Sequence, residues 1–465
     1  MVFSSTTFLF IYLPVVLAVY YLVPKRGRNL WLFLVNLVFY GWGEPVYILL
    51  MVFSIALNYA AGLLIGKRAG DGDRKRAKLF LVLDIILNLA LLGFFKYYDL
   101  FASTLSLIPG VTIPALGVTL PIGISFYTFQ TMSYPIDVYR GDCAPQRSFI
   151  TFGTFVALFP QLIAGPIVRY KDVAEQLKSR PYDLERFASG VRRFAVGLGK
   201  KVLLANNIGL LWDAMSAQAP SSLTVAGAWM GALAFSLQIY FDFSGYSDMA
   251  IGLGRMLGFE FLENFDHPYI SRSVTEFWRR WHMSLGTWFR DYVYIPLGGN
   301  RKGLARQFFN ILVVWALTGF WHGASWTFLL WGLYYAIFLM LEKAFLLKPL
   351  QKAPVLGTVY TLFVAVCGWV IFDLPDLGRA LGYYGAMFGG GAGLVCETDL
   401  FYLKNYAAVF LVSIVACLPL GKTLYHKLPE KTRSALAPVL ILAALFLSTA
   451  YLVDATYNPF LYFRF

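Results

Sequence analysis

The chain alternates between long apolar runs and short polar connections. A helix that crosses a bilayer needs roughly 20 predominantly apolar residues, and fewer where it is buried or re-entrant. Eight runs are long enough to predict spanning helices: residues 8–23, 47–65, 79–98, 223–241, 324–341, 355–373, 403–420 and 434–453. Shorter or interrupted runs predict further membrane elements, some of them incomplete crossings: residues 30–42, 118–134, 148–168, 202–212 and 305–321. The pattern predicts an all-α polytopic membrane protein.

Composition favours a membrane protein over a soluble one. Hydrophobic residues make up 58% of the 465 residues and charged residues only 14%, whereas soluble domains have about 45–50% and about 25%. A net charge of +13 would suggest a nucleic-acid partner in a soluble protein. Here Lys and Arg cluster in the connections between apolar runs, so they indicate topology, and nucleic-acid binding is not expected.

The basic connections assign the sides of the membrane by the positive-inside rule. Basic residues cluster at 24–28 and 66–78, which places both connections in the cytoplasm and the N-terminus outside. Near the other end, basic residues at 343–352 and 422–433 flank the acidic, Gly-rich stretch 374–400, which is expected outside. The C-terminus is then also expected outside the cell.

The middle of the chain is less regular. The two ends agree in sidedness only if residues 305–341 enter from the cytoplasm and return to it. Residues 169–201 carry nine Lys or Arg with apolar residues at helical spacing, which predicts a helix lying in the cytoplasmic interface plane. Residues 241–303 are too polar to span cleanly. Because non-helical polar backbone at membrane depth must be buried in protein or line a wet cavity, we expect them to form the inner wall of a funnel.

Two histidines are candidate catalytic residues. His322 lies between two apolar runs, and an ionisable residue at membrane depth indicates function by default. A neutral imidazole can take a proton from an attacking hydroxyl near pH 7, so His322 is the candidate general base for acyl transfer from a thioester. His282 is the candidate that positions or polarises the thioester. The alternative for each is a structural histidine held by hydrogen bonds to its neighbours.

Cations gather near His282 in the sequence. Guanidinium groups suit the phosphates of acetyl-coenzyme A or of an acyl-carrier thioester. The candidate donor-binding residues are Arg272, Arg279, Arg280 and Arg290, and the cluster continues through Arg301, Lys302 and Arg306. The alternative is that these cations only anchor the cytoplasmic side. Glu276 and Arg280 also have the i, i+4 spacing of a helical ion pair.

Several other kinds of site are absent from the sequence. There is no Gly-x-Ser-x-Gly elbow and no Gly-x-x-x-x-Gly-Lys-Ser/Thr loop. Neither Cys-x-x-Cys nor His-Glu-x-x-His spacing occurs, so no metal site is predicted. Cys367 and Cys417 lie in apolar runs and are expected in the core.

The last residues, 458–465, are unusually aromatic. One interpretation is an anchor in the outer membrane interface, where aromatic rings are favoured. In the other, Tyr462 folds back into the outer mouth of the protein. Its hydroxyl would then take the acyl group transiently, as covalent catalysis allows.

Several longer motifs are more specific than these single residues. They are Pro121–Phe126, Ala164–Pro166, Gln238–Gly254, Glu263–Phe265, Pro268–Tyr269, Thr275–His282, Leu297–Arg301 and Trp321–Gly323. Together they resemble the membrane-bound O-acyltransferase family, and most closely its branch of alginate O-acetyltransferase membrane subunits. The resemblance covers residues 1–345 well and the remainder loosely.

The resemblance implies a ring of tilted transmembrane helices around a thin central core with a through-membrane tunnel. It places the family's essential histidine at His322 and its second histidine at His282. The residues expected to line or support the tunnel are Asp242, Asp248, Glu276, Trp278, Trp281, Asn300 and Trp321. We expect one integral membrane domain, with N-terminal helices at 1–117, a catalytic core at 118–345 and C-terminal helices at 346–465.

The tail carries a resemblance of its own. It is similar to the tail of the small partner protein used in teichoic acid D-alanylation, where a tyrosine carries the acyl group. In this chain that tail would be fused to the transferase, which implies that Tyr462 is the corresponding tyrosine.

The sequence thus predicts an O-acyltransferase, most readily an O-acetyltransferase, of a bacterial plasma membrane. It would pass an acyl group from a cytoplasmic thioester to an extracellular or cell-wall polysaccharide, with an extracellular SGNH-type partner. One rival is a transporter or lipid flippase with a buried His and Arg path, although no internal repeat supports it. Another is a scaffold for an extracellular enzyme, which would have no use for the cation cluster.

Overall fold

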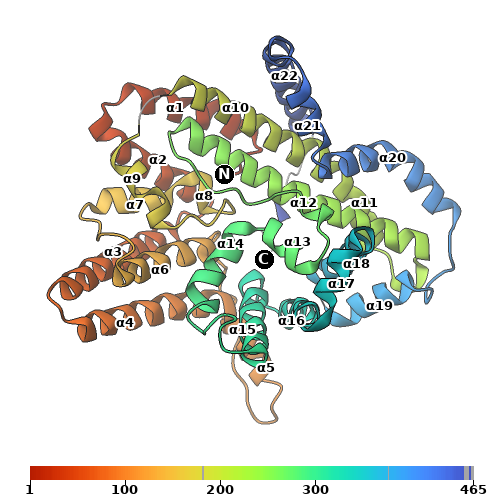
Figure 1. The fold of residues 1–465 in the computed structure, drawn as a ribbon, viewed down its shortest axis with the longest axis horizontal. Coiled ribbons are helices and arrows are strands. Elements are labelled where there is room, and N and C mark those ends of the chain that lie inside the picture. The colour runs from red at the N-terminus through yellow and green to blue at the C-terminus, as the bar shows by residue number, and fades with distance from the viewer. Residues whose placement is uncertain (181–182, 375, 455–459, 462–465) are drawn as a thin grey trace. The chain divides into compact units, whose positions relative to one another are not determined.

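The computed structural model is helical throughout, with no strand among the residues it describes, which are 1–180, 183–374, 376–454 and 460–461. The chain divides into two units. Unit 1 comprises Met1–Phe194 and Ser247–Leu262, and unit 2 comprises Ala195–Tyr246 and Glu263–Phe465. The expectation of an all-α polytopic fold is confirmed (Figure 1).

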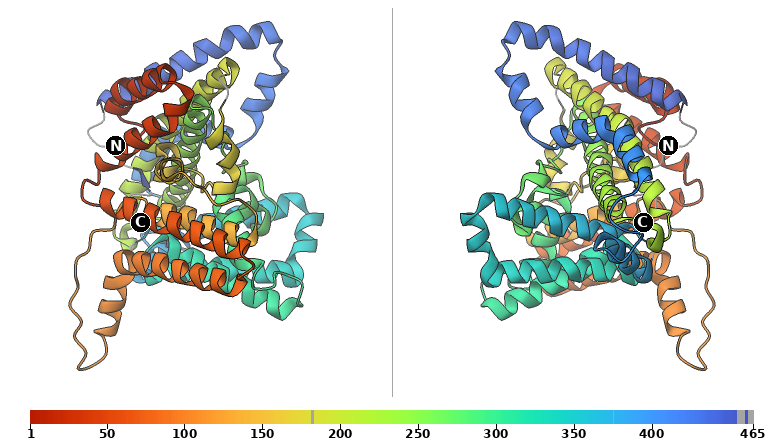
Figure 2. Two further views of the ribbon diagram at one scale, coloured as in Figure 1. Left: turned by 90° about the vertical axis from the view of Figure 1, so that its left-hand side faces the viewer. Right: turned by 90° about the vertical axis from the view of Figure 1, so that its right-hand side faces the viewer.

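Unit 1 is built from short and long helices joined by tight connections. Its elements are η1 (Phe8–Tyr12), α1 (Leu13–Leu22), η2 (Lys25–Gly27), α2 (Arg28–Gly41), α3 (Ile48–Gly70), α4 (Arg74–Leu92), η3 (Gly93–Tyr97), α5 (Tyr98–Leu105), α6 (Ile124–Arg140), α7 (Phe149–Ala157), α8 (Phe159–Leu162), α9 (Tyr170–Lys178) and most of α10 (Leu184–Gly199). Helices α3 and α4 lie side by side, and the connection after α5 extends away from them (Figure 2).

Unit 2 contains the predicted catalytic residues. Its elements are η4 (Lys200–Ala205), α11 (Asn206–Ser216), η5 (Pro220–Ser222), most of α12 (Val225–Met256), η6 (Pro268–Ile270), α13 (Val274–Arg280), α14 (Met283–Phe289), η7 (Arg290–Tyr294), α15 (Leu304–His322), α16 (Trp326–Leu341), η8 (Glu342–Leu346), α17 (Leu347–Lys352), α18 (Pro354–Asp373), α19 (Leu377–Met387), α20 (Glu397–Cys417), α21 (Leu420–Lys427) and α22 (Glu430–Asp454).

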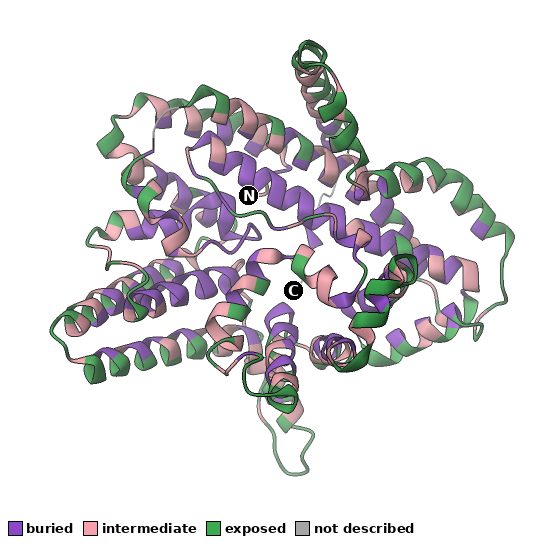
Figure 3. Cartoon of the chain, viewed as in Figure 1, coloured by how far each residue is buried: buried purple, intermediate pink, exposed green. Residues whose placement is uncertain are grey.

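Eight helices in the described part of the chain are long and apolar enough to cross a membrane. They are Ile48–Gly70, Arg74–Leu105, Leu184–Ser216, Leu304–His322, Trp326–Lys352, Pro354–Asp373, Glu397–Cys417 and Glu430–Asp454. Because the bilayer core holds no water, the backbone of a spanning segment must form its hydrogen bonds internally, as a helix does. Helices α20 and α22 expose most of their apolar residues (Figure 3), as lipid-facing helices do.

The expectation of non-helical backbone from residue 241 onward is wrong for its first part. Helix α12 continues to Met256, well past the predicted end at 241. The polar half of α12 also packs closely against α10 in each unit. In unit 2 a Cβ on Gly245 would lie 2.8 Å from the Gly197 carbonyl oxygen, and in unit 1 a Cβ on Gly252 would lie 2.6 Å from that of Gly190. Only glycine permits such an approach between α10 and α12.

The interface helix predicted at 169–201 also differs from the structure. Tyr170–Lys178 form the separate helix α9, and a second helix begins at Leu184 and runs on through a π-helical turn at Lys200–Ala205 into α11. The predicted membrane element at 202–212 is therefore part of the same 33-residue helix, which is apolar enough to span. The shorter run at 148–168 folds as two short helices, α7 and α8, because the chain breaks at Leu158 before Pro160.

Candidate functional site

His322 is the last residue of α15, at the turn of a helical hairpin with α16. The two helices approach closely because glycines occupy their contact. A Cβ on Gly319 would lie 2.3 Å from the Phe328 carbonyl oxygen, and one on Gly332 would lie 2.2 Å from that of Trp315. The predicted hairpin over 305–341 is therefore present, with His322 at its tip.

The side chain of His322 is held in one tautomer. It is only 5% exposed, and its Nδ1 lies 2.7 Å from the carbonyl oxygen of Thr318, one turn earlier in α15. Because a carbonyl oxygen only accepts, Nδ1 carries the proton, and the basic lone pair of the neutral ring is on Nε2. The ring is enclosed by Trp331 at 4.9 Å and Phe372 at 5.5 Å between centroids.

His282 is held by a different interaction, a turn around Asn264. The residue adopts φ +45° at the start of α14, a conformation uncommon outside glycine. Its Nδ1 lies 3.2 Å from Oδ1 of Asn264, and the same oxygen accepts the backbone N–H of Ser284 at 3.2 Å. Since an amide N–H only donates, that atom is the acceptor oxygen, so Nδ1 of His282 must donate to it. Its basic lone pair is also on Nε2.

Nε2 of His282 is buried and has no hydrogen-bond partner among the described residues. Burial first, and the nearby His322 second, lower the pKa of His282 well below its ordinary value, so the ring is neutral. A buried acceptor without a partner costs about 1–3 kcal/mol. A bound substrate that donates a hydrogen bond would satisfy it.

The two histidines, forty residues apart in sequence, share one neighbour in unit 2. The ring of Trp321 lies 4.9 Å from that of His322 and 5.9 Å from that of His282. Phe243 of α12 packs edge-on against His282 at 4.6 Å. The structure therefore brings together the two predicted catalytic histidines and Trp321, while their chemical roles stay predictions.

Trp278 and Trp281, predicted to support the tunnel, belong to an aromatic cluster next to the histidines. Trp281 is 2% exposed and packs 4.7 Å from Trp369. Trp278 packs 4.7 Å from Trp315 and 4.8 Å from Tyr335. These contacts join α13 to α15, α16 and α18, so the cluster fixes α13 against the hairpin that carries His322.

Arg280 is already engaged in ion pairs. The predicted pair with Glu276 is confirmed at 3.0 Å, and a second carboxylate, Asp266, also lies 3.0 Å from Arg280. Glu276 in addition accepts the backbone N–H of Arg272 at 3.0 Å. Arg280 and Glu276 therefore stabilise the turn before His282, while the Arg272 side chain is exposed.

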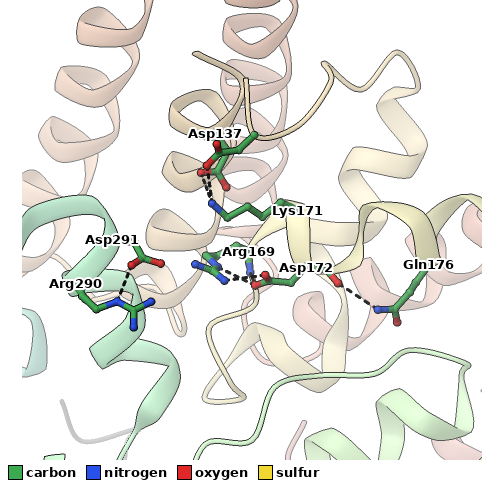
Figure 4. A network of polar contacts seen from close by, with 8 residues as sticks. Asp137, Arg169, Lys171, Asp172, Gln176, Arg290 and Asp291 are labelled. Carbon is green, nitrogen blue, oxygen red and sulfur yellow. Dashed lines mark hydrogen bonds and ion pairs between the residues drawn. The ribbon is translucent and has the colours of Figure 1, made fainter. Parts of the chain in front are cut away.

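The other predicted donor-binding cations are exposed. Arg290 pairs with its neighbour Asp291 at 2.8 Å (Figure 4). Arg279, in the last turn of α13, is exposed, as is Asn300. Exposed guanidinium groups are accessible to a phosphate, but Arg290 would have to exchange a carboxylate for it.

Asp242 lies at a buried meeting point with the C-terminal end of the chain. It forms an ion pair with Lys201, and the two side chains are 1% and 4% exposed. Its Oδ2 also accepts the backbone N–H of Leu461 at 2.9 Å, and Phe460 packs 4.6 Å from Tyr246. Leu461 and Phe460 are thus buried in unit 2. Tyr462, the next residue, lies outside the described residues.

Asp248 instead forms its ion pair within unit 1. It is 6% exposed and accepts from Nε of Arg193 at 2.6 Å, an ion pair between α12 and α10. Unit 1 holds a second such network at α9, where Lys171 pairs with Asp137 at 3.0 Å and Arg169 with Asp172 at 2.9 Å (Figure 4). Asp248 therefore has a structural explanation within unit 1.

Sequence reasoning missed two residues that shape the site. Glu342 is 1% exposed, and its carboxylate accepts the N–H groups of Val274 and Thr275 at 2.6 and 2.8 Å, which caps α13. The only signal was an acidic residue ending the apolar run 324–341. Asn264 was visible as part of a motif, but its bonds to His282 depend on a turn that spacing does not predict.

Cys367 and Cys417 are buried, as expected.

Comparison with known proteins agrees with the motifs. Residues 144–372 match the family model of the membrane-bound O-acyltransferases. The chain is 41% identical to a protein of Pseudomonas putida described as a probable alginate O-acetylase, AlgI, over the whole of both chains. It is 34% identical to the peptidoglycan O-acetyltransferase of Helicobacter pylori, covering 88% of this chain and 83% of the relative. It is 31% identical to the teichoic acid D-alanyltransferase of Streptococcus thermophilus, covering 55% and 69%.

Proposed function

Because the chain belongs to the membrane-bound O-acyltransferase family, we propose that it acetylates hydroxyl groups of an extracellular or cell-wall polysaccharide from a cytoplasmic thioester. O-acyl transfer itself follows from the family and its relatives, whose names specify alginate and peptidoglycan O-acetylation. The transporter and scaffold hypotheses are therefore set aside. The observation that carries the finer proposal is the pair of buried histidines, each with Nε2 as its basic nitrogen.

In the proposed reaction, Nε2 of His322 takes the proton of the attacking hydroxyl. The oxygen then bonds to the thioester carbonyl carbon, and collapse of the adduct breaks the C–S bond. The imidazolium returns its proton to the departing thiolate, so the products are an ester and a thiol. General base catalysis of this kind contributes about 10²–10⁴-fold to the rate.

His282 has a different proposed role. With its proton on Nδ1, it cannot donate from Nε2 to an oxyanion, so of the two roles expected for it, positioning or polarising the thioester, we propose positioning. It is suited to accept a hydrogen bond, and the pantetheine arm of coenzyme A or of a carrier protein offers amide N–H groups. We assign His282 as a residue that positions the donor arm through its unpartnered Nε2.

The donor's phosphates are proposed to lie against the exposed cations Arg272, Arg279 and Arg290. Arg280 contributes indirectly because its guanidinium already bonds Glu276 and Asp266. The donor is acetyl-coenzyme A or an acyl-carrier thioester, and either presents phosphate to these groups. A through-membrane tunnel would let the acyl group reach His322 from the cytoplasm.

Tyr462 is proposed as a transient acyl carrier. Its preceding residues, Phe460 and Leu461, are buried in unit 2 through contacts with α12, the helix whose Phe243 touches His282. Phe460 and Leu461 therefore lie against the same helix that contacts His282, and this supports a relay over a simple interfacial anchor. His322 would then deprotonate Tyr462 first, and the acyl group would pass onward in a second step.

The setting of this reaction is proposed as a bacterial plasma membrane, with both termini outside and an extracellular SGNH-type protein completing transfer to the polymer. Membrane lipids are further partners. Purified protein that releases free coenzyme A from acetyl-coenzyme A would support the donor assignment. Tyr462→Phe keeps the ring but lacks the nucleophile, so undiminished polysaccharide acetylation by this variant would exclude the relay. If the donor is an acyl-carrier thioester, turnover should occur only when the acyl-carrier protein is supplied.

A further inference from the structure

A pocket in unit 1, whose lining includes none of the residues proposed for acyl transfer, contains four arginines from three distant stretches of the chain. They are Arg28 at the start of α2, Arg180 after α9, Arg186 in α10 and Arg255 near the end of α12. Asp183 is the one carboxylate among the described lining residues. The lining therefore carries an excess of three positive charges.

The most informative of these residues is Arg180, because its charge is buried. The residue is 8% exposed, and among the described residues its guanidinium bonds no carboxylate. Instead Nε donates to the Tyr20 hydroxyl at 3.0 Å, Nη2 to Asn29 Oδ1 at 2.6 Å, and Nη1 to the Gln176 carbonyl at 2.9 Å. The guanidinium is thus fixed in place by neutral groups. A buried charge without a counter-ion is costly, so an anion in the pocket would stabilise it.

Arg28 adds a buried hydrogen-bond donor that lacks an acceptor. Its Nε is buried and has no hydrogen-bond partner among the described residues. The guanidinium lies over the ring of Tyr20 at 4.9 Å, and Arg28 is the first residue of α2, whose N-cap Gly27 offers no side-chain acceptor. The partial positive charge of that helix end therefore adds to the guanidinium charge.

The remaining charges do not neutralise the pocket. Arg255 pairs with Glu260 at 2.7 Å. Asp183 is used locally, because its Oδ1 accepts the backbone N–H groups of Glu185 and Arg186 at 2.9 and 3.2 Å at the start of α10. The guanidinium of Arg186 has one long contact, 3.5 Å, to the carbonyl of Gly258. Arg28 and Arg186 therefore have donors available to an anion, and Arg180 contributes a fixed positive charge beside them.

We propose that this pocket binds a phosphate group, supplied by the headgroup of an anionic phospholipid. The choice of a lipid rests on the surroundings. Leu22 at the end of α1 and Leu184 at the start of α10 are 82% and 65% exposed, and they directly follow the lining residues Tyr21 and Asp183 in the sequence. Exposed leucines beside a basic pocket are typical of a membrane interface, where basic pockets between helices bind acidic headgroups. The phosphates of coenzyme A share this chemistry and are the competing source.

The test uses the purified full-length protein in a neutral detergent, with bound lipid counted by native mass spectrometry and thermal unfolding measured in parallel. The probes are phosphatidylglycerol, phosphatidylcholine, coenzyme A and inorganic phosphate. The variant Arg28→Gln/Arg186→Gln removes two charges from the pocket and leaves the buried Arg180 intact. The matched control, Arg68→Gln/Arg76→Gln, removes two arginines of unit 1 that pair with Asp71 and Asp73 away from the pocket lining.

We expect the wild type to bind phosphatidylglycerol in preference to phosphatidylcholine. The pocket variant should lose about tenfold or more in this affinity, since charge-assisted bonds to phosphate are the strong ones, while the control should change less than about twofold. Equal binding by the pocket variant and the wild type would overturn the proposal. In the contrary case, coenzyme A raises the thermal midpoint of the wild type but not of the pocket variant, while phosphatidylglycerol raises neither. That result would overturn the lipid as the source of the phosphate and assign the pocket to the thioester donor. Neither readout depends on acyl transfer, so the proposed reaction is tested separately.

Discussion

The carbonyl oxygen of Thr318 accepts the Nδ1 proton of His322 at 2.7 Å, within the last turn of α15. This bond makes Nε2 the basic nitrogen of the neutral ring and fixes the ring at the tip of the hairpin. This hydrogen bond is local, because Thr318 and His322 lie in the same helix. His282 depends instead on a residue 18 positions away, Asn264, and the two histidines therefore differ in what would disturb them.

Asn264→Ala should impair donor binding more than it impairs the chemical step. The change removes the acceptor for Nδ1 of His282 and for the backbone N–H of Ser284. Each buried donor left without a partner costs about 1–3 kcal/mol. We expect a raised KM for the thioester with a smaller fall in kcat, together with a lower thermal midpoint. Asn264→Asp keeps an acceptor oxygen and should restore most of the KM, whereas equal KM values for all three proteins would refute the positioning role.

Alanine at the hairpin glycines should destabilise the fold. A Cβ at Gly319 or Gly332 would lie within 2.3 Å of a backbone carbonyl oxygen of the opposite helix, and overpacking of this kind costs about 1–3 kcal/mol. The matched control is Gly385→Ala in α19, where a Cβ would meet nothing within 4 Å. That change should be neutral or stabilising by up to about 1 kcal/mol. Thermal unfolding of the purified variants distinguishes the two cases, and equal midpoints would show that the helices do not pack this closely.

Glu342→Gln should loosen α13 without removing any bulk. Glutamine keeps one acceptor for the N–H groups of Val274 and Thr275 but loses the negative charge at the helix start. Hydrogen bonds to charged groups exceed neutral ones by about 1–2 kcal/mol, so we expect a loss of that size in thermal unfolding. Glu430→Gln, at the exposed first turn of α22, should change stability by less than about 0.5 kcal/mol. A cost as small at Glu342 would contradict the capping role.

Asp242→Asn should be more damaging alone than in combination with Lys201→Met. The single change leaves the Lys201 ammonium buried without the Asp242 carboxylate, and breaking a buried ion pair in this way costs about 3–5 kcal/mol. In the double variant the buried charge is gone, so part of the stability should return. A double-mutant cycle on thermal unfolding measures this coupling, and simple additivity of the two changes would show that the ion pair does not contribute as described.

Local patterns predicted the features that depend on neighbours in sequence. The hairpin over 305–341, the Glu276–Arg280 pair and the buried Cys367 and Cys417 all follow from apolar periodicity or i, i+4 spacing. The motifs added the family, which composition alone could not give. His322 was identifiable because an ionisable residue within an apolar hairpin is rare and costly.

The features that the sequence did not predict depend on contacts between distant segments. Helix α12 was expected to end at 241 because Asp242 and Asp248 looked too polar for a helix at membrane depth. Each has a cation from another helix, Lys201 in unit 2 and Arg193 in unit 1, and these pairs make the polar half tolerable. The cap that Glu342 provides for α13 was invisible for the same reason, since 68 residues separate it from Val274.

The most direct test of the account is polysaccharide O-acetylation in cells that express His322→Gln at the wild-type level. Because product is measured on the polymer, the result does not depend on which thioester is the donor. Loss of the base should lower acetylation by about 10²–10⁴-fold, while His426→Gln, an exposed histidine in α21, should acetylate like the wild type. Acetylation by His322→Gln within about twofold of the wild type, with normal folding, would contradict the assignment of His322 as the general base.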